Sequence, residues 1–388
     1  MSTFGVSEDH LELREVTRQV AREVIAPRAA EVDEGGVFPE TSLAALVAAG
    51  LHAIGLPEAY GGQGGDLLAS VIVAEEIARA CMTTQQVSGG NELFVWPLLL
   101  GGSQALCDRY LPRIASGEAL GAFALSEPEA GSDVAAMTTR ATRVEGSEGG
   151  WRLKGTKRWI TNAGRADLYV VFAVTDPGAG ARGISAFVVE SGDAGLSFGA
   201  PEKKMGLRGS PTAEVYLDAT IPADRIVGDP GQGLRLALGT LDRTRAVVAG
   251  QAVGVAQAAL DCALAYARER RQFGRPIGEF QGVQFMLADM ETKIRAARLL
   301  AYDAAREAEA AGPDMSLAGA AAKCFASDVA MAVTTDAVQI LGGAGYTRDF
   351  PAERLMRDAK ITQIYEGTNQ IQRVVIARQL LVGVQNRL

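Results

Sequence analysis

The strand-forming segments of this chain lie in a single block between two helical regions, and this order constrains the fold more than any other feature. Short, β-branched segments bounded by turns, such as "DLYVVFAVTD", "GISAFVVE" and "TAEVYLDATIP", occur between about residues 120 and 228. On either side, apolar residues recur at three- to four-residue spacing, which is typical of helices. Strands that do not alternate with helices disfavour a doubly wound sheet. We therefore predict an α+β fold with an N-terminal helical domain (1–120), a middle antiparallel β domain (121–228) and a C-terminal helical bundle (229–388).

Length and composition narrow the class of protein. With 388 residues and 48% hydrophobic residues, the chain can form two or three domains with a large core. A net charge of -8 argues against nucleic-acid binding, which needs a clustered basic surface. The N-terminus is acidic and amphipathic, unlike a signal peptide, and no apolar run approaches the ~18 residues that span a bilayer. We expect a cytoplasmic protein without a membrane span.

Two familiar catalytic motifs fail on their context. "GAGARG" (178–183) matches the dinucleotide fingerprint, but a strand-like segment follows it where a helix is required. "GLSFG" (195–199) matches the nucleophile elbow, but no histidine follows it in the chain. The four cysteines are widely spaced and there are two histidines, so we expect reduced core cysteines and no metal site. The groups that remain as candidates for catalysis are carboxylate, arginine, hydroxyl and amide groups, together with an organic cofactor.

Five short blocks, taken in order, point to a family. They are "FALSEPEAGSD" (123–133), "GTKRWITNAG" (155–164), "RRQFG" (270–274), "DAVQILGGAGY" (336–346) and "YEGTNQIQR" (365–373). With these blocks and its α–β–α order, the chain resembles the acyl-CoA dehydrogenases, a family of flavoproteins, from about residue 7 to its end. Its motifs are most similar to those of the short- and medium-chain members.

The resemblance implies an FAD site whose flavin end lies on the middle domain. Ser126 and the neighbouring amides are expected to hold the flavin, and Ser132 approaches the coenzyme A moiety. Trp159 offers an aromatic face to the isoalloxazine ring, and Thr161 directs its hydroxyl toward the reactive nitrogen. The full expected set of FAD-binding residues is Phe123, Leu125, Ser126, Ser132, Trp159, Ile160, Thr161, Arg270, Gln272, Phe273, Gln281, Gln339, Leu341, Gly342, Gly343, Thr368 and Gln370.

Part of that set is expected to serve a neighbouring subunit. An arginine can bind pyrophosphate through a charge-assisted bidentate fork, and two successive glycines allow close backbone approach to a dinucleotide. By resemblance, Arg270, Gln339 and the Gly342–Gly343 backbone contact the FAD of the adjoining subunit. The resemblance therefore implies a homo-oligomer, which we expect to be a homotetramer built as a dimer of dimers.

Glu366 is the expected catalytic base. Dehydrogenation of a saturated thioester needs a base for the α-proton, stabilisation of charge on the thioester oxygen, and a nearby hydride acceptor. A carboxylate in a desolvated pocket is a stronger base, and Gly367 allows the chain to pass close to a ligand. The family's catalytic glutamate occupies this position in "YEGT". Some relatives carry the acid instead near residue 242, but "LDRTRAVV" has Thr244 and no glutamate.

The substrate-binding residues are also expected from the resemblance. Asp242 is placed near the CoA adenine and Arg245 along the acyl-CoA; the complete set is Ser132, Asp242, Arg245, Tyr365 and Gly367. Residues 82–97 are expected to line the acyl pocket, and they are more polar than a plain fatty tail requires. Thr84 stands where glutaryl-type members place an arginine, so a dicarboxylate substrate is disfavoured. Short, branched or polar-tailed acyl groups remain open.

The expected reaction is FAD-dependent dehydrogenation of an acyl-CoA to the trans-2-enoyl-CoA in fatty acid β-oxidation, with an electron-transferring flavoprotein as acceptor. Three alternatives remain. A same-fold oxidase or flavin monooxygenase would pass electrons to oxygen, and a related dehydrogenase would act on a carrier-protein-bound acyl chain. A non-catalytic helical scaffold would bind no flavin and be colourless.

Overall fold

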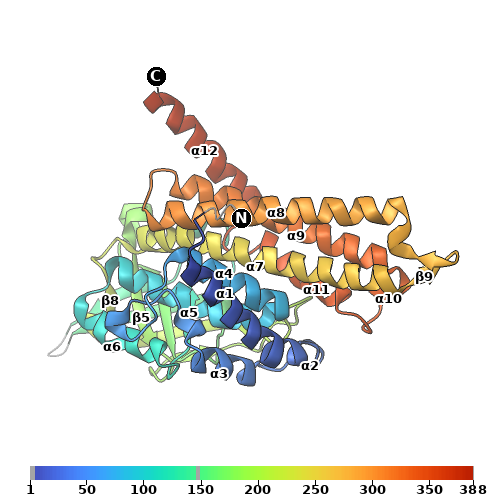
Figure 1. Cartoon of the computed structure of the whole chain (residues 1–388). Helices are drawn as coiled ribbons and strands as arrows, with labels where there is room; N and C mark the ends of the chain where they lie inside the picture. The colour runs from blue at the N-terminus through green and yellow to red at the C-terminus, as the bar shows by residue number, and fades with distance from the viewer. Residues whose placement is uncertain (1–4, 146–148, 388) are drawn as a thin grey trace.

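The computed structural model describes residues 5–145 and 149–387, which form a helical part, a β-sheet and a second helical part in chain order (Figure 1). Ser7 caps the first helix by accepting a hydrogen bond from the His10 amide, as its position before an amphipathic run predicts. The N-terminal helices are α1 (Glu8–Val20), α2 (Ala29–Gly35), α3 (Glu40–Ala48), α4 (Leu67–Ala80), α5 (Met82–Gly101) and α6 (Gln104–Ala115).

The middle part is a sheet that is mostly antiparallel. Within the described residues its strands are β1 (Gly121–Ala124), β2 (Arg140–Val144), β3 (Gly150–Thr161), β4 (Leu168–Val174), β5 (Ile184–Glu190), β6 (Leu196–Phe198), β7 (Thr212–Ile221) and β8 (Ile226–Val227). Their order is β6-β7-β3-β2-β4-β5-β8, with β1 parallel to β4. The predicted α+β fold is therefore confirmed, and the two motifs set aside above lie in the β4–β5 connection and around β6.

One local prediction was wrong. The segment 146–161 suggests a hairpin, but residues 150–161 form the single strand β3, and residues 146–148 lie outside the described part. β3 pairs with β2 on one side and β7 on the other, both antiparallel. Its polar residues alternate with buried ones because they face opposite sides of the sheet.

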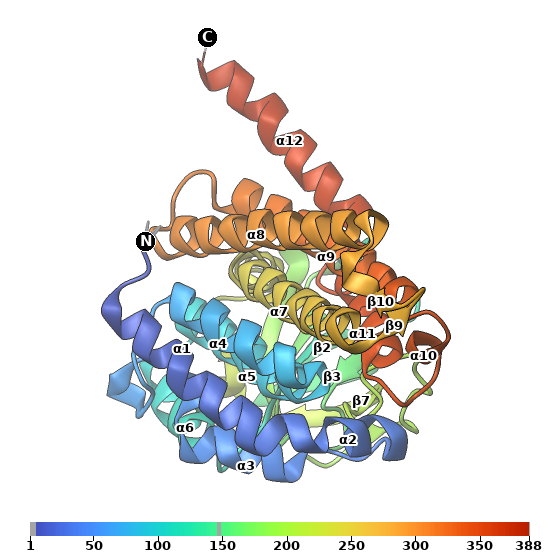
Figure 2. The same cartoon turned by 45° about the vertical axis from the view of Figure 1, so that its right-hand side comes forward.

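The C-terminal part contains three long helices that lie side by side (Figures 1 and 2). They are α7 (Gly233–Glu269), α8 (Gln281–Glu309) and α9 (Met315–Leu341), and the short strands β9 (Arg271–Gln272) and β10 (Arg275–Pro276) join the first two. α10 (Gly343–Tyr346) and α11 (Ala352–Ala359) follow, and α12 (Asn369–Arg387) extends away from the rest of the molecule in both views.

Two of these helices are long and apolar enough to cross a membrane by length and composition alone. In α7, 72% of the most apolar window is buried inside the protein, and in α9 61% is buried. Small residues allow this packing: a Cβ at Gly254 of α7 would lie 2.2 Å from the Glu75 carbonyl oxygen of α4. Both helices thus serve as core helices of this fold.

Candidate active site

Glu366 lies in a tight turn between α11 and α12. Its φ is +51° and that of Gly367 is +94°, so both residues adopt the left-handed conformation. For a residue with a Cβ this conformation is unfavourable by roughly 1–2 kcal/mol, and such strain concentrates at functional positions. The side chain turns toward α7, where its Oε2 accepts a 2.7 Å hydrogen bond from the Thr244 hydroxyl.

The surroundings of Glu366 pull its pKa in two directions. Burial raises the pKa of the carboxyl above its ordinary value, and this is the largest effect. The hydrogen bond from Thr244 and the positive charges of Arg245 and Lys323 lower the pKa, but not enough to cancel the effect of burial. The group is therefore a stronger base than an exposed glutamate and still has donors that favour its ionised form.

The predicted substrate-binding residues collect around this turn. Arg245 is buried and pairs with Asp242 at 2.6 Å, while its Nε has no partner among the described residues. The Tyr365 hydroxyl donates to Gln251 Oε1. Ser132 lies apart in an exposed loop of the middle part.

The residues predicted to contact the flavin ring, Trp159, Ile160 and Thr161, lie where β3 is distorted. The β3–β7 register shifts between Lys157 and Ile160, and Trp159 has a φ of +63°. Such a bulge re-aims a side chain, and the Trp159 side chain is 54% exposed while Ile160 is 2% exposed. The Ser126 carbonyl accepts a 2.9 Å bond from the Arg158 amide, so the β1 end and the bulge adjoin.

Polar contacts connect the bulge to the helices around Glu366. The buried Asn162 donates to the carbonyls of Val87 (3.0 Å) and Gly121. Gln86 of α5 donates to the Thr161 hydroxyl at 3.4 Å. Gly89 of the same helix packs against Gln251 of α7, since a Cβ added at Gly89 would lie 3.5 Å from the Gln251 side-chain nitrogen. α5 therefore lies between the strand that carries Thr161 and the helix that contacts Tyr365.

The predicted FAD residues around β9 and at the C-terminal end of α9 lie far from Glu366 in the same chain, whereas Thr368 and Gln370 lie two and four residues after it. The 26 residues from Thr244 to Arg270 span about 39 Å along α7 at about 1.5 Å per residue. Phe273 (φ +52°) is 93% exposed. Also exposed are Arg270, Gln272, Gln281, Gln339, Gly342, Gly343 and Gln370. Leu341 is buried, Leu125 is buried beside β1, Phe123 packs edge-on against Phe172, and Thr368 Oγ1 accepts from the Ile371 amide.

The residues present fit a flavin dinucleotide. An exposed indole on a strained bulge, with Ser126 bound through its carbonyl to Arg158 and Thr161 at the end of the same strand, suits a planar ring with polar edges. At Gly342 and Gly343 an added Cβ would meet nothing within 4 Å, which leaves this backbone open to a close ligand. These features lie at two separate places on one subunit.

An α–β–α fold with a partly buried carboxylate on a strained turn and an exposed indole on a strand bulge fits the class of flavin-dependent acyl-thioester oxidoreductases. Three domain families match the chain: the N-terminal domain of acyl-CoA dehydrogenase over residues 7–118, the middle domain over 122–220 and the C-terminal domain over 231–381. The chain belongs to the acyl-CoA dehydrogenase family and is an FAD-dependent oxidoreductase.

Relatives extend over the whole chain. The "Probable acyl-CoA dehydrogenase fadE25" of Mycobacterium leprae (strain TN) is 55% identical over 379 residues, 97% of each protein. The solved structure of butyryl-CoA dehydrogenase from Megasphaera elsdenii is 40% identical with a TM-score of 0.93, covering 97% of this chain and 98% of that one. The prolyl acyl carrier protein oxidase AnaB is 29% identical with a TM-score of 0.91, covering 96% and 99%.

Several residues around the base were not predicted from sequence. Lys323, Gln372 and Asn369 are buried and hydrogen-bond the turn or one another. A lysine within the Ala-rich segment "AGAAAKCFA" is the one signal that could have drawn attention to them. The sequence analysis noted Thr244 only because its segment has no glutamate where some relatives carry the catalytic acid. It did not predict that Thr244 donates a hydrogen bond to Glu366.

Proposed function

We propose that the protein dehydrogenates an acyl-CoA thioester between Cα and Cβ to give the trans-2-enoyl-CoA, with Glu366 as the base. The observation that carries this proposal is the Glu366 carboxylate itself, held in a left-handed turn, with its pKa raised by burial and a hydrogen bond from Thr244. A carboxylate of this kind is suited to removing a weakly acidic proton next to a carbonyl.

Each group around the thioester has a separate role in the proposed reaction. Glu366 removes the α-proton and holds it on its carboxyl group. No described residue accepts a hydrogen bond from the Glu366 amide, so this N–H is free to bind the thioester oxygen and stabilise the charge that develops there. Arg245 and Asp242 bind the CoA side. When bound, FAD supplies the acceptor for the β-hydrogen as hydride, with Trp159, Thr161 and Ser126 holding its ring.

For the substrate we propose a short to medium acyl chain on CoA. The motifs resemble those of short- and medium-chain members, and the structural relative from Megasphaera elsdenii is a butyryl-CoA dehydrogenase. A second candidate is an acyl group on a carrier protein, since the AnaB oxidase shares the fold. The rate of flavin bleaching, measured with the same acyl group at equal concentration on CoA and on carrier protein, would distinguish the two candidates.

We also propose a cytoplasmic homotetramer, a dimer of dimers, that passes its electrons to an electron-transferring flavoprotein as part of fatty acid β-oxidation. This proposal is supported by the exposed Arg270, Phe273 and Gln339. They lie too far from Glu366 of the same subunit to bind the same FAD, so we propose that they bind the FAD of a neighbouring subunit.

Anaerobic mixing of the FAD-loaded protein with a series of acyl-CoAs from butyryl to octanoyl tests the proposal. The flavin absorbance should bleach, and Glu366→Gln should retain FAD and ligand binding while losing bleaching by several orders of magnitude. Bleaching of the Glu366→Gln protein at the wild-type rate would mean that another residue is the base. Hydrogen peroxide release in air at the rate of turnover would indicate the oxidase alternative.

A further inference from the structure

Lys323 is a buried cation whose acceptors lie on the catalytic turn. It sits within α9 and has no exposed surface. Its Nζ donates to the Gly367 carbonyl at 2.8 Å and to Asn369 Oδ1 at 3.0 Å. Burial lowers its pKa to about 8, against an opposing effect of the Glu366 charge. A lysine is rarely buried without a carboxylate partner, so this position calls for an explanation.

Besides Glu366, the carboxylate that acts on Lys323 is Asp328, and it is bound to another cation. Asp328 pairs with Arg373 at 2.8 Å. In the part of the chain that the structure describes, both hydrogen-bond acceptors of Lys323 are neutral. The charge of Lys323 therefore acts mainly on Glu366, across the turn.

The turn is held through its carbonyl groups. The Gln372 side-chain amide donates to the Glu366 carbonyl (3.1 Å) and to the Gly367 carbonyl (2.8 Å), and Lys323 donates to the latter as well. With both carbonyls bound on the α9 and α12 side, the Glu366 carboxylate reaches Thr244 on α7. Since Glu366 has an unfavourable φ, these contacts are what maintain the conformation.

We propose that Lys323 is a positioning residue for the reaction: it fixes the Glu366–Gly367 turn so that the carboxylate meets the substrate's α-carbon, and it places a positive charge behind the base. This inference rests on the proposed role of Glu366. Lys323 has no exposed surface and its acceptors lie on the turn and at the start of α12, so it acts through the turn.

The charged groups around Glu366 allow a specific pH test. Arg245 faces Glu366 from α7, Lys323 from α9 and the carboxyl of Glu92 from α5, with Tyr365 adjoining. Activity requires ionised Glu366, so it rises as the pH passes the pKa of Glu366. Removing the charge of Lys323 raises that pKa and moves the acidic limb of the kcat/KM profile to higher pH, by about one unit.

The experiment compares Lys323→Met, Lys323→Gln and Lys323→Arg in the FAD-loaded enzyme. Lys323→Met is expected to slow flavin bleaching by about 10- to 100-fold at neutral pH and to shift the acidic limb. Lys323→Gln keeps an N–H donor without the charge and should shift the limb as well, so it replaces Lys323→Met if the latter does not fold. Lys323→Arg should leave the limb in place. Lys360→Met, which removes an exposed lysine near the same turn, is the matched control and should behave as wild type.

Two results would overturn the inference. An acidic limb that does not move in either uncharged variant, with the rate lowered equally at every pH, would assign Lys323 a purely structural role. Rates within twofold of wild type would remove any role. Loss of activity in Glu366→Gln together with wild-type behaviour of the Lys323 variants refutes this inference alone, whereas a wild-type protein that no acyl thioester bleaches refutes the proposed function.

Discussion

At the scale of single residues, the proposed base Glu366 combines burial with a small number of hydrogen-bond donors. Burial raises the pKa of Glu366, while the hydrogen bond from Thr244 and the charges of Arg245 and Lys323 lower it. Hydrogen-bond donors without burial would lower the pKa of the carboxyl group and make Glu366 a weak base. The Thr244 hydroxyl is the nearest donor and the one that can be removed without changing charge.

Thr244→Val should therefore shift the acidic limb of the kcat/KM profile upward. A valine keeps the shape of the side chain and removes the 2.7 Å hydrogen bond to the ionised carboxylate. A hydrogen bond of roughly 1.5 kcal/mol corresponds to about one pH unit. Thr240→Val is the matched control, because Thr240 is buried one turn earlier and donates to the Leu236 carbonyl. Equal shifts in both variants would contradict a specific role for Thr244.

Glu92 offers a pH prediction for stability. Its Oε2 is buried without a partner among the described residues, and burial raises its pKa to about 7 from 4.5. Between pH 4.5 and 7 the folded state holds a proton that the unfolded state has lost, so the wild-type free energy of unfolding decreases as the pH rises through this window and stays lower above it. Glu92→Gln should remove the Glu92 share of this decrease, up to about 3 kcal/mol above pH 7 relative to pH 4.5. The buried Asp358, whose pKa burial also raises to about 7, still contributes its own share.

Denaturant unfolding of wild type and Glu92→Gln from pH 4.5 to 8 measures this difference. Glu40→Gln, at a side chain that is 72% exposed, should leave the pH dependence of the wild type unchanged. Parallel stability curves for wild type and Glu92→Gln would show that the Glu92 carboxyl ionises normally in the folded protein.

At the scale of elements, the bulge in β3 depends on a buried ion pair beneath it. Lys157 is fully buried, and its Nζ donates to Glu127 Oε1 at 2.8 Å and to the Leu125 carbonyl at 3.1 Å. The charge of Lys157 keeps the pKa of Glu127 low, at about 2, against the effect of burial. Lys157 is the last paired residue before the register shift and Trp159 lies within it, so the ion pair fixes the strand next to the predicted flavin face.

Lys157→Met should destabilise the protein by about 3–5 kcal/mol and reduce its FAD content, since it leaves the Glu127 charge buried without its partner. Adding Glu127→Gln should recover part of the loss, because the second change removes the stranded charge. Thermal unfolding and the flavin-to-protein absorbance ratio measure both effects. A double variant no more stable than Lys157→Met would argue against the ion pair as the cause.

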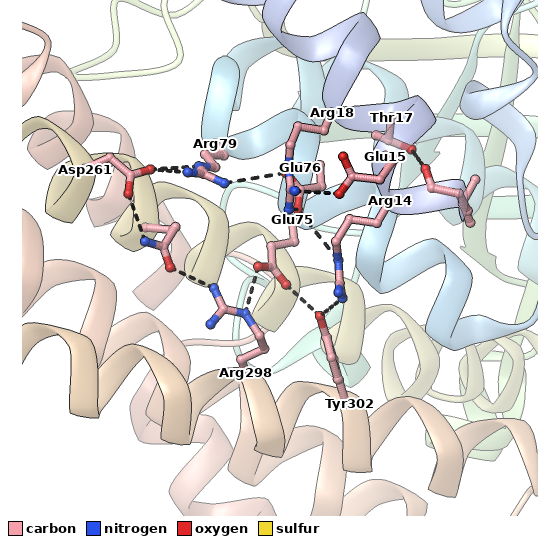
Figure 3. Close-up of polar contacts among 12 residues, drawn as sticks. Arg14, Glu15, Thr17, Arg18, Glu75, Glu76, Arg79, Asp261, Arg298 and Tyr302 are labelled. Atoms are coloured by element: carbon pink, nitrogen blue, oxygen red, sulfur yellow. Dashed lines mark hydrogen bonds and ion pairs between the residues drawn. The ribbon is translucent and has the colours of Figure 1, made fainter. Parts of the chain in front are cut away.

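A network of charged residues joins α1, α4, α7 and α8 (Figure 3). Glu76 accepts two hydrogen bonds from Arg18 of α1, at 2.7 and 3.1 Å, and lies within 4 Å of Arg14 and Arg79 as well. Its neighbour Glu75 accepts from Arg298 and from Tyr302 of α8. Helices distant in sequence are thereby held on one another by a few buried carboxylates.

Glu76→Gln should loosen α1 from α4 and lower the free energy of unfolding by about 3 kcal/mol, because three guanidinium groups lose their shared anion. Hydrogen exchange of residues 8–20 should increase more than that of the bundle helices. Glu15→Gln is the control: Glu15 also contacts Arg18, at 2.7 Å, but is 67% exposed, so its loss should cost no more than about 1 kcal/mol.

At the scale of the whole molecule, some features could be predicted from sequence and others could not. The helix and strand blocks follow from local patterning, and Glu366 could be proposed because its neighbours in "YEGT" form a local motif. Its partners Thr244 and Lys323 lie 122 and 43 residues away in sequence, and only the packing of α7 and α9 brings them to the turn. The bulge at Trp159 was missed for the same reason: it is a register shift against β7, a strand about 50 residues later.

One chain holds the parts of its predicted flavin site at two distant places. The bulge at Trp159 lies near α5, while Arg270, Phe273 and Gln339 are exposed at the far end of the long helices, where β9 is labelled in Figure 1. Because the distance from Thr244 to Arg270 is about 39 Å, we propose that the two sets meet on one FAD by being contributed from different subunits. A C2 dimer would form two such sites, each with Glu366 from one subunit and Arg270 from the other.

Mixing two inactive variants tests this arrangement directly. Glu366→Gln and Arg270→Glu homodimers should both be inactive, the first for lack of a base and the second for lack of the pyrophosphate contact. In a heterodimer, one site carries both changes and the other carries neither, so an equal mixture refolded or co-expressed should recover about a quarter of the wild-type activity per subunit. If Arg270 instead served the site of its own subunit, every site in the heterodimer would carry one change and no activity would return. Glu366→Gln mixed with Lys323→Met is the control that should not complement, because Lys323 of α9 contacts the Glu366–Gly367 turn of its own chain.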